Sequence, residues 1–339
     1  MMKISYKLRS GGSIFSTVVN QWHRKYLSTS RPEYAFEMSS STLRFGNGVT
    51  KEIGQDIINL GIRDSVCVVT DKKLVNMSPF HSVANSLAAA GVQFDVFDDV
   101  TVEPTDKSLK LAIDFCRENQ YKAFIAVGGG SVMDTAKAAN LYMCHPEAEF
   151  LDFVNAPIGK GLPVPSALRP LIAVPTTAGT GTVFSIQSTL SLSNYTDAMI
   201  GSETTGVSIF DYLESNTKTG IRDRALRPTL AIIDPDHTAT CSPQLTAFTG
   251  LDVLCHALES FTAVPYRERI TGAPSSSLLR PAYQGSNPIA EIWSGYALQQ
   301  CSKHLRHAVE YGDPRAREQM CLASTAAGVG FGETLSIFT

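Results

Sequence analysis

The feature that most constrains the fold is a regular alternation of short apolar runs and amphipathic segments in the first two thirds of the chain. Four apolar runs have the length and β-branched content of buried strands: 65–71, 122–130, 170–177 and 229–235. Between them, three segments have helical spacing: 82–91, 107–120 and 133–143. An order of strand, helix and strand predicts a parallel sheet with crossover helices.

The pattern changes after Asp234-Pro235. Ser242 is a good N-cap and Pro243 suits the first helical position, so a helix is expected to begin there. Helical spacing continues through 287–312 and 314–332. A chain of 339 residues suits two domains. We therefore expect an α/β dinucleotide-binding domain over 33–240 and an all-helical metal and substrate domain over 241–339.

The first 32 residues differ in charge from the rest. They are rich in serine and contain six basic residues and no acid: Lys3, Lys7, Arg9, Arg24, Lys25 and Arg31. This composition is typical of a mitochondrial transit peptide over 1–32 and predicts a matrix location. The alternative is a basic, disordered tail.

Charge and hydropathy exclude two classes of partner. Without residues 1–32 the chain carries 23 basic and 32 acidic residues, a formal charge of −9. No basic stripe is present to bind the phosphates of a nucleic acid. No apolar run approaches the 18 or so residues of a membrane span. The seven scattered cysteines are typical of reduced, buried thiols.

A glycine-rich turn lies between an apolar strand and a helix. Gly128, Gly129, Gly130 and Ser131 let the backbone approach a ligand closely, and the helix N-terminus attracts a pyrophosphate. The turn lacks the GxGxxG pattern, so a purely structural turn is the alternative. Asp71 closes an earlier strand, where it would bind ribose hydroxyls and favour NAD over NADP, or simply cap the following helix.

Asp252 and His256 lie four residues apart on an expected helix. Their side chains leave the same helical face and could bind one metal ion. The alternative is a hydrogen bond within the helix.

Together, these segments resemble the iron-containing (group III) alcohol dehydrogenases. "GGGSVMDTAKA", "PTTAGTG" and "DVLCHALES" follow that family's order. "FLDFVNAPIGKG" and "RPAYQGSNPI" are similar to its mitochondrial hydroxyacid–oxoacid transhydrogenase branch. The resemblance covers about 33–332. It implies a dehydroquinate synthase-like fold with the active site between the two domains.

The resemblance also implies cofactors, site residues and a reaction. NAD would contact Asp71, Gly129, Gly130, Ser131, Asp134, Thr176, Thr177, Thr180 and Lys218. A divalent metal, iron rather than zinc, would bind Asp252 and His256 and polarise the substrate oxygen. The implied partners are small hydroxyacids and oxoacids, with 4-hydroxybutyrate oxidised as 2-oxoglutarate is reduced. An ordinary NAD-dependent alcohol dehydrogenase remains an alternative, and a homo-oligomer is left open.

The chain departs from the family pattern twice. The family places two further metal-binding histidines after the "GFG" segment, whereas here only His304 and His307 follow His256. An unusual stretch at 182–201 also separates "PTTAGTG" from "SETTG". Our hypothesis is intron sequence translated in both places; a true insertion and a short isoform are the alternative. A third function is therefore a catalytically inactive, truncated product that at most binds nucleotide.

Overall fold

The centre of the molecule is a six-stranded parallel sheet with strand order β1-β8-β5-β4-β2-β3. The computed structural model describes residues 35–38, 40–178, 202–269 and 284–331. The strands are β1 (Thr42–Phe45), β2 (Val66–Val69), β3 (Phe94–Phe97), β4 (Ala123–Gly128), β5 (Leu171–Pro175) and β8 (Leu230–Ile233). Because all neighbours pair in parallel, the carboxyl ends of the strands meet at one edge of the sheet.

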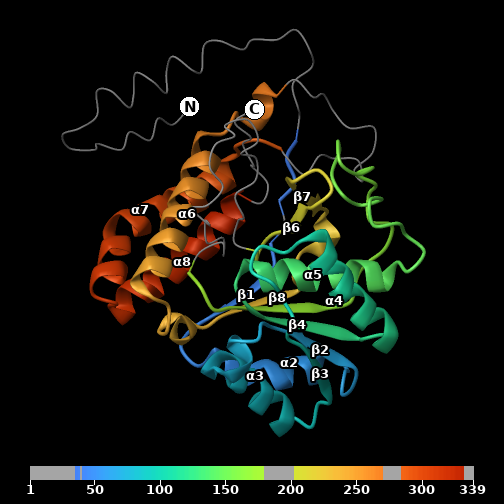
Figure 1. Cartoon of the computed structure of the whole chain (residues 1–339). Coiled ribbons are helices and arrows are strands. Elements are labelled where there is room, and N and C mark those ends of the chain that lie inside the picture. Colours follow the sequence, from blue (N-terminus) through green and yellow to red (C-terminus); the bar gives the residue numbers. More distant parts are fainter. Residues whose placement is uncertain (1–34, 39, 179–201, 270–283, 332–339) are drawn as a thin grey trace, which may run out of the picture.

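Helices cover both faces of this sheet (Figure 1). On β2, Val66 and Val68 pack on one side, against the cluster of α2 (Ile53–Asn59) and α3 (Ser78–Ala89). Cys67 and Val69 point to the other side, where α4 (Asp106–Asn119) and α5 (Gly130–Cys144) pack. Strands buried on both faces need apolar residues at every position, which explains their continuous apolar runs.

An antiparallel hairpin lies beside α5. It consists of β6 (Val207–Tyr212) and β7 (Thr217–Arg222). Phe210 and Ile221 pack with Leu141 and Tyr142 of α5, so the hairpin covers part of that helix. The helix is consequently buried along most of its length.

Three long helices form a separate bundle, α6 (Pro243–Thr262), α7 (Pro288–Glu310) and α8 (Pro314–Phe331). The Ser242 hydroxyl caps α6 by accepting from the N–H of Leu245, and Asn287 caps α7 in the same way. The bundle core is made mostly of alanines, which let the helices approach closely. Figure 1 shows these helices beside the carboxyl edge of the sheet.

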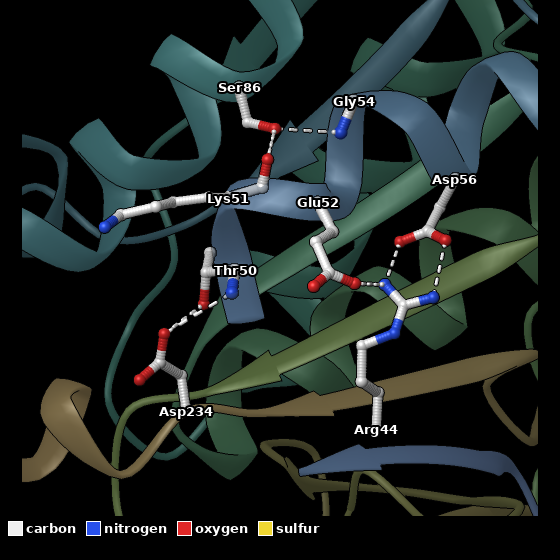
Figure 2. Close-up of polar contacts among 8 residues, drawn as sticks. All are labelled: Arg44, Thr50, Lys51, Glu52, Gly54, Asp56, Ser86 and Asp234. Carbon is white, nitrogen blue, oxygen red and sulfur yellow. Dashed lines mark hydrogen bonds and ion pairs between the residues drawn. The ribbon is translucent and has the colours of Figure 1, made fainter. Parts of the chain in front are cut away.

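A polar junction joins the sheet to the bundle at the end of β8. Asp234 accepts hydrogen bonds from the backbone and hydroxyl of Thr50, as Figure 2 shows. Beyond it, the 3-10 helix η4 (Pro235–Thr238) leads toward α6. Arg317 of α8 donates to the carbonyl oxygens of Thr238 (2.6 Å) and Cys241 (3.0 Å). This buried guanidinium fixes the bundle against the segment that connects β8 to α6.

A second set of polar contacts in Figure 2 anchors the edge strand β1 and the helices that follow it. Arg44 on β1 forms two bonds with the carboxylate of Asp56 on α2, at 2.6 and 2.8 Å. The Ser86 hydroxyl on α3 accepts from the N–H of Gly54 and donates to the carbonyl of Lys51. These bonds hold α2 and α3 beneath the sheet.

The predicted fold class is confirmed, with an α/β part and a helical part. The exact domain boundaries stay a prediction. The expected transit peptide, the stretch 182–201 and the end of the chain lie outside the described residues. Across the described ranges, none of the helices combines the length and the apolar character that crossing a membrane requires.

Candidate functional site

The glycine-rich turn lies at the carboxyl end of β4, where it opens α5. A Cβ atom on Gly128 would come within 2.5 Å of the Val132 side chain, so the turn needs glycine there. Gly129 is the N-cap of α5 and supplies no side chain to bind the first N–H groups. A helix end without a side-chain cap presents free donors and a positive dipole to an anion. The geometry fits a pyrophosphate.

Ser131 connects this turn to a neighbouring loop. Its hydroxyl oxygen accepts from the N–H of Glu103 (3.3 Å), and its carbonyl accepts from the Thr135 hydroxyl (2.8 Å). Ser131 is half-buried in the first turn of α5. The predicted cofactor residues Gly129, Gly130 and Ser131 are therefore brought together at one helix end.

Asp71 follows β2 at the same edge of the sheet. Its Oδ1 accepts from the N–H groups of Lys73 (2.8 Å) and Leu74 (2.9 Å). The capping role expected as an alternative is thus present, and both bonds use one oxygen. Asp71 is half-buried, and it pairs by a backbone bridge with Asp99.

Thr176 and Thr177 follow β5, next to the glycine turn. The N–H of Thr176 donates to the carbonyl of Gly128 (3.1 Å), and its own carbonyl accepts from the thiol of Cys241 (3.4 Å). Ala178 packs against the core of the helical bundle. This short segment therefore spans from the turn to the bundle. Thr180 lies outside the described residues.

Asp134 lies away from the open end of α5. Its carboxylate is buried beneath the turn, where Oδ1 accepts from the Ser202 hydroxyl (2.9 Å). Burial raises its pKa to about 6, while the positive charges of Lys137 and Lys218 oppose that rise. Lys218 itself is half-exposed on β7, 3.7 Å from an oxygen of Asp211. Of Asp134 and Lys218, only Lys218 is partly exposed to solvent.

Asp252 and His256 share one face of α6, as their spacing predicts. Oδ1 of Asp252 and Nε2 of His256 are 3.7 Å apart. The histidine is fully buried with its ring 4.7 Å from that of Phe331, and the carboxylate is 14% exposed. A carboxylate oxygen and an imidazole nitrogen are suitable donors for iron or zinc.

Asp252 and His256 are two candidate ligands, fewer than a metal site needs. No group of three or more His, Cys, Asp or Glu side chains with metal-binding geometry occurs among the described residues. A catalytic zinc site uses three protein ligands and one open position. Asp252 and His256 therefore fit as two ligands of such a site.

Sequence reasoning missed a buried polar cluster under the turn. Lys137 is fully buried, and Ser202 and Glu203 are nearly so. The detectable signal was the placement of Asp134 and Lys137, three residues apart in an otherwise uncharged helix. Charged residues are seldom fully buried unless they are paired.

Comparison with known proteins relates the chain to one family of enzymes. Residues 40–199 match the family described as iron-containing alcohol dehydrogenase. The mitochondrial hydroxyacid-oxoacid transhydrogenase of Mus musculus is 52% identical over 301 residues, which cover 88% of this chain and 60% of the mouse protein. Its Homo sapiens counterpart is 50% identical over the same shares. The chain thus spans about 60% of the length of these relatives.

Solved structures have the same fold. The sulfoacetaldehyde reductase of Bifidobacterium kashiwanohense, in complex with NAD+, has a TM-score of 0.69 and 28% identity. The match covers 88% of this chain and 68% of the reductase. A 1,3-propanediol oxidoreductase matches with a TM-score of 0.71 and 25% identity, covering 88% of this chain and 66% of that one.

Proposed function

Because residues 40–199 match the iron-containing alcohol dehydrogenase family, we propose that the chain belongs to that family and is an NAD-linked, metal-dependent oxidoreductase acting on CH–OH groups. The observation that carries this proposal is the uncapped glycine turn at the start of α5, joined through Thr176 to the bundle that holds Asp252 and His256. The proposed dinucleotide site and the proposed pair of metal donors would thus lie on either side of one short segment.

The chain's own residues would bind and orient the cofactor. Gly129, Gly130 and Ser131 would hold the pyrophosphate at the helix N-terminus. Asp71 would accept from the adenosine ribose and repel a 2′-phosphate, which favours NAD over NADP. Lys218, half-exposed on β7, would reach the ribose or phosphate from the other side. When bound, NAD supplies a carrier for hydride.

Thr176 and Thr177 would line the space between the turn and the bundle. Asp252 and His256 would hold the divalent metal, with iron favoured over zinc. When bound, that metal supplies a Lewis acid for the substrate oxygen. The imidazole of His256 is fixed by its burial against Phe331, so its orientation would be set before any ligand arrives.

The substrate class follows from the named relatives. At 52% identity to a hydroxyacid-oxoacid transhydrogenase, the chain would oxidise a hydroxyacid such as 4-hydroxybutyrate to its semialdehyde and reduce 2-oxoglutarate to 2-hydroxyglutarate. The hydroxyl carbon loses a hydride and the oxygen a proton, and the oxoacid carbonyl gains both. The exchange therefore balances without release of reduced cofactor. The mitochondrial names of these relatives support a matrix location.

Isotope transfer tests this function. The purified protein is incubated with 4-hydroxybutyrate deuterated at its hydroxyl carbon, 2-oxoglutarate and ferrous iron, with no NAD added, and 2-hydroxyglutarate is examined by mass spectrometry. Deuterium at its C2 supports the transhydrogenase. Transfer that requires added NAD identifies an ordinary NAD-linked dehydrogenase. No oxidation under either condition contradicts both enzymatic functions.

A further inference from the structure

Lys137 forms a buried clamp directly behind the glycine turn. Its side chain is fully buried on α5, two turns after Gly130. Its Nζ donates to the carbonyl of Ser202 (2.7 Å), the hydroxyl of Ser202 (2.6 Å) and the carbonyl of Val207 (2.8 Å). An ammonium has three N–H donors, so every one is used.

The partner of this clamp is itself held firmly. We call residues 202–207 the anchored strip; it leads into β6 and lies 65 residues beyond Lys137. Donors from three other places in the chain bind its carbonyl oxygens: Ser41 to Glu203 (3.1 Å), Arg227 to Thr204 (3.2 Å) and Asp223 to Gly206 (3.0 Å). Lys137 thus fastens α5 to a fixed part of the structure.

Buried carboxylates balance the charge of Lys137. Asp134, one turn earlier on α5, accepts from the same Ser202 hydroxyl, and Glu203 lies on the strip. Burial raises the pKa of each carboxyl to about 6, against the attraction of Lys137. The other charges facing this cluster are Lys218 on β7 and Arg227 after η3 (Arg224–Leu226).

We propose that Lys137 is a positioning residue for the cofactor site: it fixes α5 against the anchored strip, and thereby sets the position of the first turn of this helix, with Asp134 as its buried counter-charge. This inference rests on the proposed function of the same turn, and it gives Asp134 a supporting role in place of direct contact with the pyrophosphate. Small displacements of an anion-binding helix end cost affinity steeply, because its N–H groups must converge on the ligand.

The test compares Lys137→Met with Lys122→Met. Methionine keeps much of the side-chain length but removes the donors. Lys122 is 54% exposed and pairs with Asp64 on the surface, so its variant controls for loss of a lysine charge. Two properties are measured: the dissociation constant for NADH by fluorescence at pH 8 and pH 6, and hydrogen–deuterium exchange of peptides covering 128–135 and 202–207.

The clamp predicts a specific pattern. Lys137→Met should bind NADH on the order of tenfold more weakly at pH 8. The loss should shrink at pH 6, because removing the lysine raises the pKa of Asp134 further and more of that carboxyl is then neutral. Exchange should accelerate in both peptides. Lys122→Met should behave as the unmodified protein.

Other outcomes overturn the inference. If Lys137→Met lowers only the melting temperature, while NADH affinity, its pH profile and exchange at 128–135 are unchanged, Lys137 has no positioning role. If the single variant does not fold, Asp134→Asn/Lys137→Met removes both charges of the Asp134–Lys137 pair and takes its place, with the weakening at pH 8 still expected. If the unmodified protein does not bind NADH, the proposed function is contradicted instead. Hydrogen–deuterium exchange at 128–135 in Lys137→Met, compared with the unmodified protein, then tests the clamp alone.

Discussion

The backbone N–H of Thr176 donates to the carbonyl oxygen of Gly128 over 3.1 Å, so that β5 and β4 end at one point. The carbonyl of Thr176 in turn accepts from Cys241, two residues before α6 begins. A continuous path of hydrogen bonds therefore runs from the glycine turn to the helix that carries Asp252 and His256. This path is the physical basis of our proposal that the sheet and the bundle share a single site.

Asp71→Asn should weaken the preference for NADH over NADPH. Asparagine keeps an acceptor oxygen for the N–H groups of Lys73 and Leu74 but removes the charge that would repel a 2′-phosphate. We expect the dissociation constant for NADPH, divided by that for NADH, to fall on the order of tenfold, as measured by fluorescence titration. Asp99→Asn, in the neighbouring bridge partner that pairs with Lys72, is the control. An unchanged ratio would leave Asp71 with its capping role alone.

Asp252 and His256 should contribute jointly to binding a divalent cation. We expect Asp252→Asn and His256→Asn each to lower the affinity for Zn²⁺ or Co²⁺ by at least about tenfold in calorimetric titration, since each removes one of two described donors. The control is His307→Asn, an exposed histidine on α7. Equal affinity in all three variants would show that the metal binds elsewhere.

We expect protonation of His237 to lower the stability of the fold as the pH falls. This ring lies in the junction at the end of β8, 2.7 Å from the Thr50 hydroxyl, and burial lowers its pKa below the ordinary 6.5. A histidine whose folded pKa is depressed favours folding most above pH 6.5, and this contribution is lost as the pH falls toward the folded value. Burial of Asp134 and Glu203 changes the stability with pH in the opposite direction. It raises the pKa values of these carboxyls, so their contribution to stability grows as the pH falls.

Comparison of variants isolates the contribution of His237. Urea unfolding is measured from pH 7.5 to 5.5 for the unmodified protein, for His237→Gln and for the exposed control His81→Gln. The difference in unfolding free energy between the unmodified protein and His237→Gln should narrow as the pH falls. A constant difference would mean that His237 keeps the same protonation in both states.

Much of the fold could be predicted because its elements have local signals. Buried parallel strands have continuous apolar runs, and Ser242 and Pro243 mark the start of α6 by the chemistry of a helix end. The strand β1 was missed because it is a four-residue edge strand without a buried position. The hairpin β6–β7 was missed too. It follows the unusual stretch 182–201, whose sequence gives no signal for where the next strand begins.

The site was less predictable from sequence, for a physical reason. Residues on one turn of helix, such as Asp252 and His256, could be paired by spacing alone. The bonds from Lys137 to Ser202 cross 65 residues of sequence, so no local pattern indicates them. The family resemblance placed Asp134 with the pyrophosphate, and the structure places its carboxylate in the buried cluster.

Binding of NADH by the glycine turn is the central claim, and Gly128→Ala tests it most directly. The new methyl group would lie 2.5 Å from Val132 and force the start of α5 to move, whereas Gly295→Ala on α7 meets only Phe261 at 3.7 Å. Fluorescence titration should show saturable NADH binding by the unmodified protein and by Gly295→Ala, and a loss of at least about tenfold in Gly128→Ala. Absence of NADH binding by the unmodified protein, or equal affinity in a folded Gly128→Ala, would contradict the assignment of this turn as the cofactor site.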